Sequence, residues 1–76
     1  MGRLLDILQK IPEARGLEKQ YYIQKAREQL RYGNVQENIK DIKRITNPDL
    51  IRWLFAIGLK QPYYTIALER LKELMG

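Results

Sequence analysis

The chain has 76 residues, carries 14 Lys and Arg against 9 Asp and Glu for a formal net charge of +5, and contains no Cys, His or Ser. These absences exclude disulfides, thiolate and imidazole metal ligands, and serine or cysteine nucleophiles. We therefore assign no catalytic residue, no metal and no cofactor, and we expect a protein that is not an enzyme. With 45% apolar and 30% charged residues the composition is globular, and we expect one domain over residues 1–76.

The first half of the chain predicts three amphipathic helices, over residues 2–11, 17–32 and 35–45. Gly33 and Asn34 separate the second helix from the third: Gly33 ends the second helix, and Asn34 is the expected N-cap of the third. Apolar residues recur at helical spacing on the expected inner faces, which carry Leu4, Ile7, Leu8 and Ile11, then Tyr22, Ile23, Ala26 and Leu30, then Val35, Ile39 and Ile42.

The second half predicts two more helices. Asn47 is the expected N-cap of the fourth helix, with Pro48 at its first position, and this helix runs to about Leu59. The fifth helix begins at Gln61-Pro62 and has an expected inner face of Tyr64, Ala67, Leu68, Leu71 and Leu74. Because no segment alternates like a strand, we predict an all-α fold, a small bundle of about five short helices arranged as antiparallel helical hairpins.

A faint internal repeat accompanies this pattern. Residues 39–45 match residues 68–74 in their apolar positions, 29 residues apart. The second hairpin resembles a HEAT-like repeat, because residues 47–52 read Asn-Pro-Asp-Leu-Ile-Arg where such repeats often carry Asp-Pro-x-Val-Arg. The turn of the first hairpin, with Leu30, Gly33, Asn34 and Ile39, looks like that of a tetratricopeptide repeat. Both resemblances imply stacked helical hairpins, whereas the alternative is that any two amphipathic hairpins align this well.

The fourth predicted helix is apolar on nearly every face. Its only solvent-facing stripe on a helical wheel consists of Asp49, Arg52, Ala56 and Lys60. A helix that is apolar all round is buried all round, which makes this segment the expected centre of the domain. A domain of this size can hardly enclose a helix completely. The alternative is therefore that part of the fourth helix is exposed and forms an interface. The candidate protein-binding residues here are Trp53, Phe55 and Leu59.

A tyrosine face is predicted on the second helix. Tyr21, Lys25, Glu28 and Tyr32 recur at the spacing i, i+4, i+7 and i+11, opposite the apolar face. Tyr beside Lys suits protein recognition, since the ring is large and amphipathic. The alternative is that the tyrosines pack on a neighbouring helix. We take Tyr21, Lys25 and Tyr32 as further candidate protein-binding residues.

A basic face is predicted on the third helix. Lys40, Lys43 and Arg44 project away from its apolar positions. Phosphate contacts need cations held on one face, so these residues, with Arg27 and Arg31, are the candidate nucleic-acid-binding set. The alternative is a solvated face on which the acidic residues Glu37 and Asp41 pair with these cations.

The sequence therefore leaves two functions open. The first is a non-enzymatic helical protein–protein interaction module, with a second copy of the chain among its candidate partners. The alternative is a small basic nucleic-acid-binding protein. We expect no membrane partner, because the longest apolar run, residues 53–57, is far shorter than the roughly 18 residues of a span. We also expect a cytoplasmic location, because the N-terminus lacks the features of a secretory signal.

Overall fold

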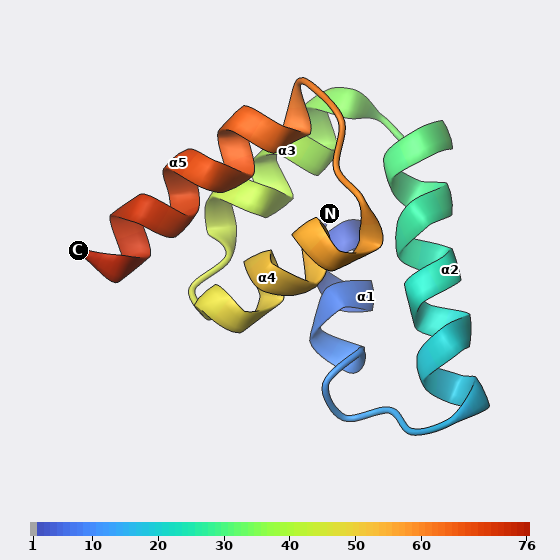
Figure 1. Ribbon diagram of the computed structural model, residues 1–76. Coiled ribbons are helices and arrows are strands. Elements are labelled where there is room, and N and C mark those ends of the chain that lie inside the picture. Colours follow the sequence, from blue (N-terminus) through green and yellow to red (C-terminus); the bar gives the residue numbers. More distant parts are fainter. Residues whose placement is uncertain (1) are drawn as a thin grey trace.

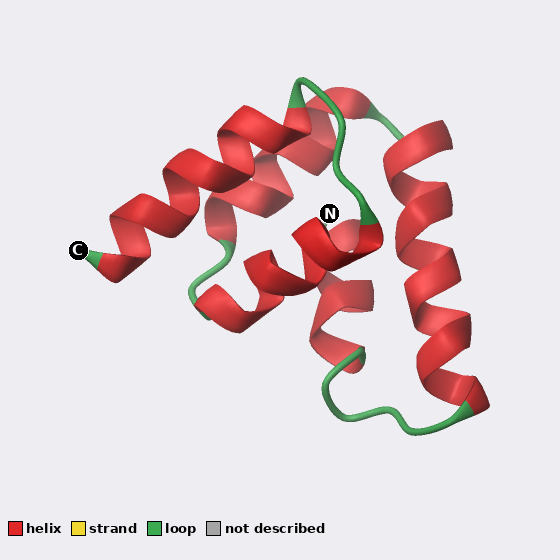
Figure 2. Ribbon diagram, in the orientation of Figure 1, coloured by secondary structure: helices red, strands yellow, loops and turns green. Residues whose placement is uncertain are grey.

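The computed structural model describes residues 2–76, and over that range the chain folds into five helices joined by loops, with no strand (Figures 1 and 2). The predicted all-α class is confirmed. In chain order the helices are α1 (Arg3–Lys10), α2 (Leu17–Tyr32), α3 (Val35–Arg44), α4 (Pro48–Ile57) and α5 (Tyr63–Met75).

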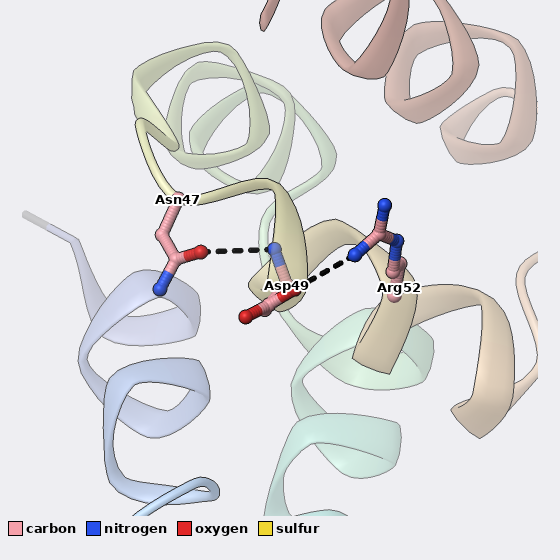
Figure 3. A network of polar contacts seen from close by, with 3 residues as sticks. All are labelled: Asn47, Asp49 and Arg52. Carbon is pink, nitrogen blue, oxygen red and sulfur yellow. Dashed lines mark hydrogen bonds and ion pairs between the residues drawn. The ribbon is translucent and has the colours of Figure 1, made fainter. Parts of the chain in front are cut away.

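Local capping signals fix where α3 and α4 begin. The side chain of Asn34 accepts a hydrogen bond from the backbone N–H of Glu37 at 3.0 Å, so Asn34 is the N-cap of α3. Asn47 caps α4 in the same way, accepting from the backbone N–H of Asp49 at 3.0 Å (Figure 3). Arg52 pairs with the Asp49 carboxylate at 2.9 Å one turn later. Both predicted N-caps are confirmed.

The helices pack with α1 near the middle of the bundle. α1 and α2 lie side by side and run in opposite directions, as do α4 and α5 (Figure 1). α3 packs against α1 and α5, whereas the consecutive helices α3 and α4 make little contact with each other. The guanidinium of Arg70 on α5 donates to the carbonyl of Ile45, just after α3, at 2.8 Å. This bond helps to hold α5 against α3.

The hydrophobic core is built from one face of each helix. Its fully buried large side chains are Leu4, Leu8, Ile11, Ile42, Ile45, Ile51 and Leu54. α1 contacts α2, α3 and α4; its Leu4 and Leu8 are fully buried, and Leu5 and Ile7 are partly buried against the core. α4 is not buried all round, because Trp53 and Phe55 are only half-buried, so the alternative in which part of this helix reaches the surface describes it better. α4 keeps the predicted solvent stripe, since Asp49, Arg52 and Ala56 are exposed, and it shares the central position with α1.

Two predicted inner-face residues lie outside the core. Val35 is 46% exposed because it is the first residue of α3, at the edge of the bundle. Tyr64 is also 46% exposed, whereas Tyr63 is 6% exposed. Because α5 begins at Tyr63, the inward i, i+4 pair is Tyr63 and Ala67. The inner face of α5 thus keeps the predicted Ala67, Leu71 and Leu74 but begins at Tyr63 instead of Tyr64.

Candidate binding surfaces

An open groove with a volume of about 620 Å³ lies between the C-terminal half of α2 and the connection from α4 to α5. These two segments face each other on the right-hand side of Figure 1. We call it the basic groove, because its lining contains three cations and no carboxylate. The lining consists of Arg27, Leu30, Arg31, Ile57, Gly58, Leu59, Lys60, Gln61 and Tyr63.

A buried amide holds the two walls of the basic groove together. Asn38 on α3 is fully buried and donates through Nδ2 to the backbone carbonyl of Gln29 at 2.9 Å and to the hydroxyl of Tyr63 at 3.1 Å. Its Oδ1 accepts from the side chain of Gln29 at 3.1 Å. Gln29 belongs to α2 and Tyr63 begins α5. One side chain therefore links the helices on the two sides of the groove through hydrogen bonds.

A direct contact also crosses the basic groove. Arg27 Nε donates to the carbonyl of Ile57, the last residue of α4, at 3.4 Å. The last carbonyls of a helix lack intrahelical donors, and a cation there suits the negative end of the helix dipole. This contact orients the guanidinium of Arg27 across the groove rather than toward bulk solvent.

The connection after α4 needs a glycine. Gly58 has φ = 105°, a backbone conformation that favours glycine, and its N–H donates to the carbonyls of Leu54 and Phe55. Beyond it, the backbone N–H groups of Leu59, Lys60 and Gln61 have no acceptor among residues 2–76. Three consecutive residues that line the basic groove thus have backbone N–H groups that the described chain does not use.

The cations on the basic face of α3 form no ion pair with either expected acidic partner, Glu37 or Asp41, among the described residues. Lys40, Lys43 and Arg44 are exposed, and none of them forms an ion pair within the described part of the chain. Asp41 is only 3% exposed and accepts from the backbone N–H groups of Leu4 and Leu5 at 3.0 and 3.2 Å. The alternative in which Asp41 pairs with the α3 cations is therefore wrong. Its carboxylate instead caps the N-terminus of α1.

The five predicted nucleic-acid-binding residues do not share one cavity. Arg27 and Arg31 line the basic groove with Lys60, which the sequence did not single out. Arg44 lines a different hollow, whose other residues come from α1, the loop that follows it, the α3–α4 loop and α4. The helical wheel of α2 alone indicates that Arg27 and Arg31 share one side, but the identity of the third cation depends on tertiary packing.

The tyrosine face of α2 is exposed, as its spacing predicted. Tyr21 is 56% exposed and Tyr32 is 78% exposed. Lys25 lies between them, with its ammonium 5.4 Å from the ring centroid of Tyr21 and 3.9 Å from the carboxylate of Glu28. Lys25 and Tyr32 line a shallow hollow with Ile7 of α1. The binding role of these residues stays a prediction.

The three apolar candidates of the α4 region have different surroundings. Trp53 is half-buried, and the ammonium of Lys19 lies 5.0 Å above its ring. Phe55 is half-buried against Tyr64, with ring centroids 5.3 Å apart. Leu59 is half-buried in the lining of the basic groove. Because Trp53 and Phe55 are two residues apart on a helix, they project to opposite sides of α4 rather than into one patch.

Comparisons with known proteins add no assignment. The chain matches no protein-family model, and no curated protein or solved structure shows significant similarity to it. The resemblance to helical hairpin repeats therefore stays a prediction. Among residues 2–76, no helix combines the length and the apolar character needed to cross a bilayer.

Proposed function

We propose that the protein is a non-enzymatic helical module that binds other proteins, and that the basic groove takes an anionic, partly apolar segment of its partner. The observation that carries this proposal is the lining of the groove: Arg27, Arg31 and Lys60 beside Leu30 and Leu59, with no acidic residue. Binding sites of this kind combine an apolar floor with a few placed polar groups that set orientation.

The hydrogen bonds of Asn38 support the same proposal. Asn38 ties both walls of the groove, so little conformational entropy is lost when a partner binds there. The three cations steer an acidic segment toward the groove, and the apolar floor supplies contact area once the segment arrives. A segment with Asp or Glu near Leu, Ile or Phe fits both properties.

Selection from a random peptide display library on the immobilised protein tests the proposal. We expect enriched peptides to carry acidic residues next to apolar ones. The double variant Arg31→Glu with Lys60→Glu should weaken their binding by roughly tenfold or more, because it reverses two groove charges. The matched control, Lys40→Glu with Lys43→Glu, changes the net charge equally on α3 and should keep binding. Equal loss in both variants would show that only net charge matters and would contradict the proposal.

A second candidate function, nucleic-acid binding by the α3 face, is favoured by the position of Asp41. Because that carboxylate accepts from the N-terminus of α1, it does not pair with Lys40, Lys43 or Arg44, and these cations form no ion pair among the described residues. Cations free of ion pairs are the ones that exchange counterions for phosphates.

The same two double variants separate the candidates. If α3 binds nucleic acid, a short duplex or single strand should bind with an affinity that falls steeply as salt is added, and the Lys40→Glu, Lys43→Glu variant should lose it. The groove variant should retain it. Absence of oligonucleotide binding in low salt removes this second candidate and leaves the groove proposal as it stands.

A further inference from the structure

The fold leaves most hydrogen-bond donors of the three groove cations unused. The contact of Arg27 with Ile57 engages Nε alone and leaves both terminal amino groups of the guanidinium free. No N–H group of Arg31 has an acceptor among the described residues, and its guanidinium carbon lies 6.0 Å from the ring centroid of Tyr32. Lys60 donates to no described side chain or carbonyl. The groove thus presents three charges and an array of free donors.

A single carboxylate matches this array poorly, because it brings one negative charge and two oxygens. A phosphate monoester carries about two negative charges near neutral pH and three acceptor oxygens. Its oxygens accept from a guanidinium in the bidentate way that Arg favours, and the opposite wall contains Leu59, Lys60 and Gln61, whose backbone N–H groups have no acceptor among residues 2–76. The charge and donor count of the groove therefore match a phosphoryl dianion better than a carboxylate.

We infer that the basic groove binds a phosphorylated side chain of a partner protein, with the phosphoryl group at Arg27, Arg31 and Lys60 and the apolar part of the segment on Leu30 and Leu59. This inference rests on the proposed function, since it names the partner chemistry of the same groove. Charge complementarity and the anchoring of Arg27 by Ile57 carry it. Arg clusters recognise phosphorylated segments elsewhere by the same physics.

A nucleic-acid strand fits the same groove less well. Each phosphodiester has only one negative charge, and strand binding relies on exposed aromatic rings on which bases stack. The aromatic residue in the lining is Tyr63, which is 6% exposed and hydrogen-bonded to Asn38. The lining itself offers no exposed ring for stacking, and the exposed ring of Tyr32 lies outside it, so we assign the phosphoryl ligand to a protein side chain.

Two small probes with one aromatic ring each test the charge preference. Phenyl phosphate and benzoate are titrated into the isotope-labelled protein, and backbone amide shifts are followed by NMR. At pH 7.5 we expect both to shift the amides of residues 57–61, with phenyl phosphate binding at least about fivefold more tightly, because its second charge faces three cations. Lys60→Gln, which removes no described contact, should erase most of that preference, whereas the control Lys40→Gln should leave it unchanged.

Acidification gives an independent readout on the same protein. The second phosphate pKa is about 6, so lowering the pH to about 5.2 removes one charge from phenyl phosphate, and its advantage should shrink. Benzoate keeps its charge there, because an ordinary carboxyl pKa is about 4, and its binding should hardly change.

The outcomes separate the inference from the proposed function. Equal affinity for the two probes at pH 7.5, or an advantage that survives acidification, would overturn the phosphoryl inference while leaving an acidic partner segment possible. Shifts centred on α3 instead of the groove, or tighter binding of a single-stranded oligonucleotide at residues 57–61, would also overturn it. Failure of both probes to reach the groove, together with no selected peptide, would remove the proposed function as well.

Discussion

Asp41 and Asn38 are the two buried polar side chains of the core, and each satisfies groups that belong to other helices. The Asp41 carboxylate accepts from the free N–H groups at the start of α1, where a negative charge also suits the helix dipole. Asn38 joins α2 to α5. Both residues sit on α3, so this helix organises its neighbours through polar contacts as well as apolar packing.

Replacing Asp41 by Ala should destabilise the domain by about 1–3 kcal/mol, because two buried N–H groups of α1 lose their acceptor. Thermal or urea unfolding followed by circular dichroism measures the change. Glu69→Ala is the control, because Glu69 is an exposed carboxylate with no ion pair in the described chain, and it should stay within about 0.5 kcal/mol of the parent. If Asp41→Ala were as mild as the control, the capping role assigned to this carboxylate would be wrong.

The sequence could not have revealed these roles. Asp41 stands among Lys40, Lys43 and Arg44, and a helical wheel places it with them as readily as with the core. The two N–H groups that donate to its carboxylate lie 36 and 37 residues away in the chain, so only the packing of α3 on α1 shows which helix it caps. Contacts within a few residues behave differently, and the Asn34 and Asn47 caps were predictable for that reason.

At the scale of single helices, hydrophobic periodicity predicted the helices themselves better than it predicted their positions in the bundle. α2 has the predicted bounds, Leu17–Tyr32, because Gly16 and Gly33 bracket an uninterrupted 3.6-residue pattern. The pattern of α4 is correct as well, but apolar content alone does not say which helix is central. α1 is short yet packs against three others, and this depends on the arrangement of all five helices.

α4 offers a direct comparison between a core residue and a boundary residue. Leu54 is fully buried, so Leu54→Ala should cost about 2–5 kcal/mol. Trp53 is half-buried beneath Lys19, and Trp53→Ala should cost less than Leu54→Ala although more atoms are removed. Chemical unfolding of both variants gives the order. A mild Leu54→Ala beside an unfolded Trp53→Ala would mean that the orientation of α4 is wrong.

At the scale of the whole molecule, the net charge of +5 is distributed over separate surfaces. The cations of the α3 face and those of the basic groove line different parts of the bundle, and ion pairs engage Lys25, Arg52 and Arg70. The sequence could predict an excess of positive charge and the pairing of Arg27 with Arg31 on one side of α2. It could not predict Lys60 as their neighbour, because that depends on where the α4–α5 connection crosses α2.

Self-association is a property of the whole molecule too. The apolar residues expected to form a dimer contact are half-buried, and Trp53 and Phe55 face opposite sides of α4. We therefore expect sedimentation equilibrium to report a monomer across the micromolar range. A concentration-dependent dimer that Trp53→Ala abolishes would contradict this expectation and would restore Trp53 as an interface residue.

The most direct test of the central claim is the binding footprint of a display-selected acidic peptide on the isotope-labelled protein, mapped by amide shifts in NMR. Three surfaces compete for it: the basic groove, the tyrosine face and the basic face of α3. If the peptide binds in the basic groove, the largest amide shift changes should occur at residues 27–31 and 57–63, and the Arg31→Glu, Lys60→Glu variant should lose them. Changes centred on Tyr21, Lys25 and Tyr32, or on residues 40–44, would contradict it.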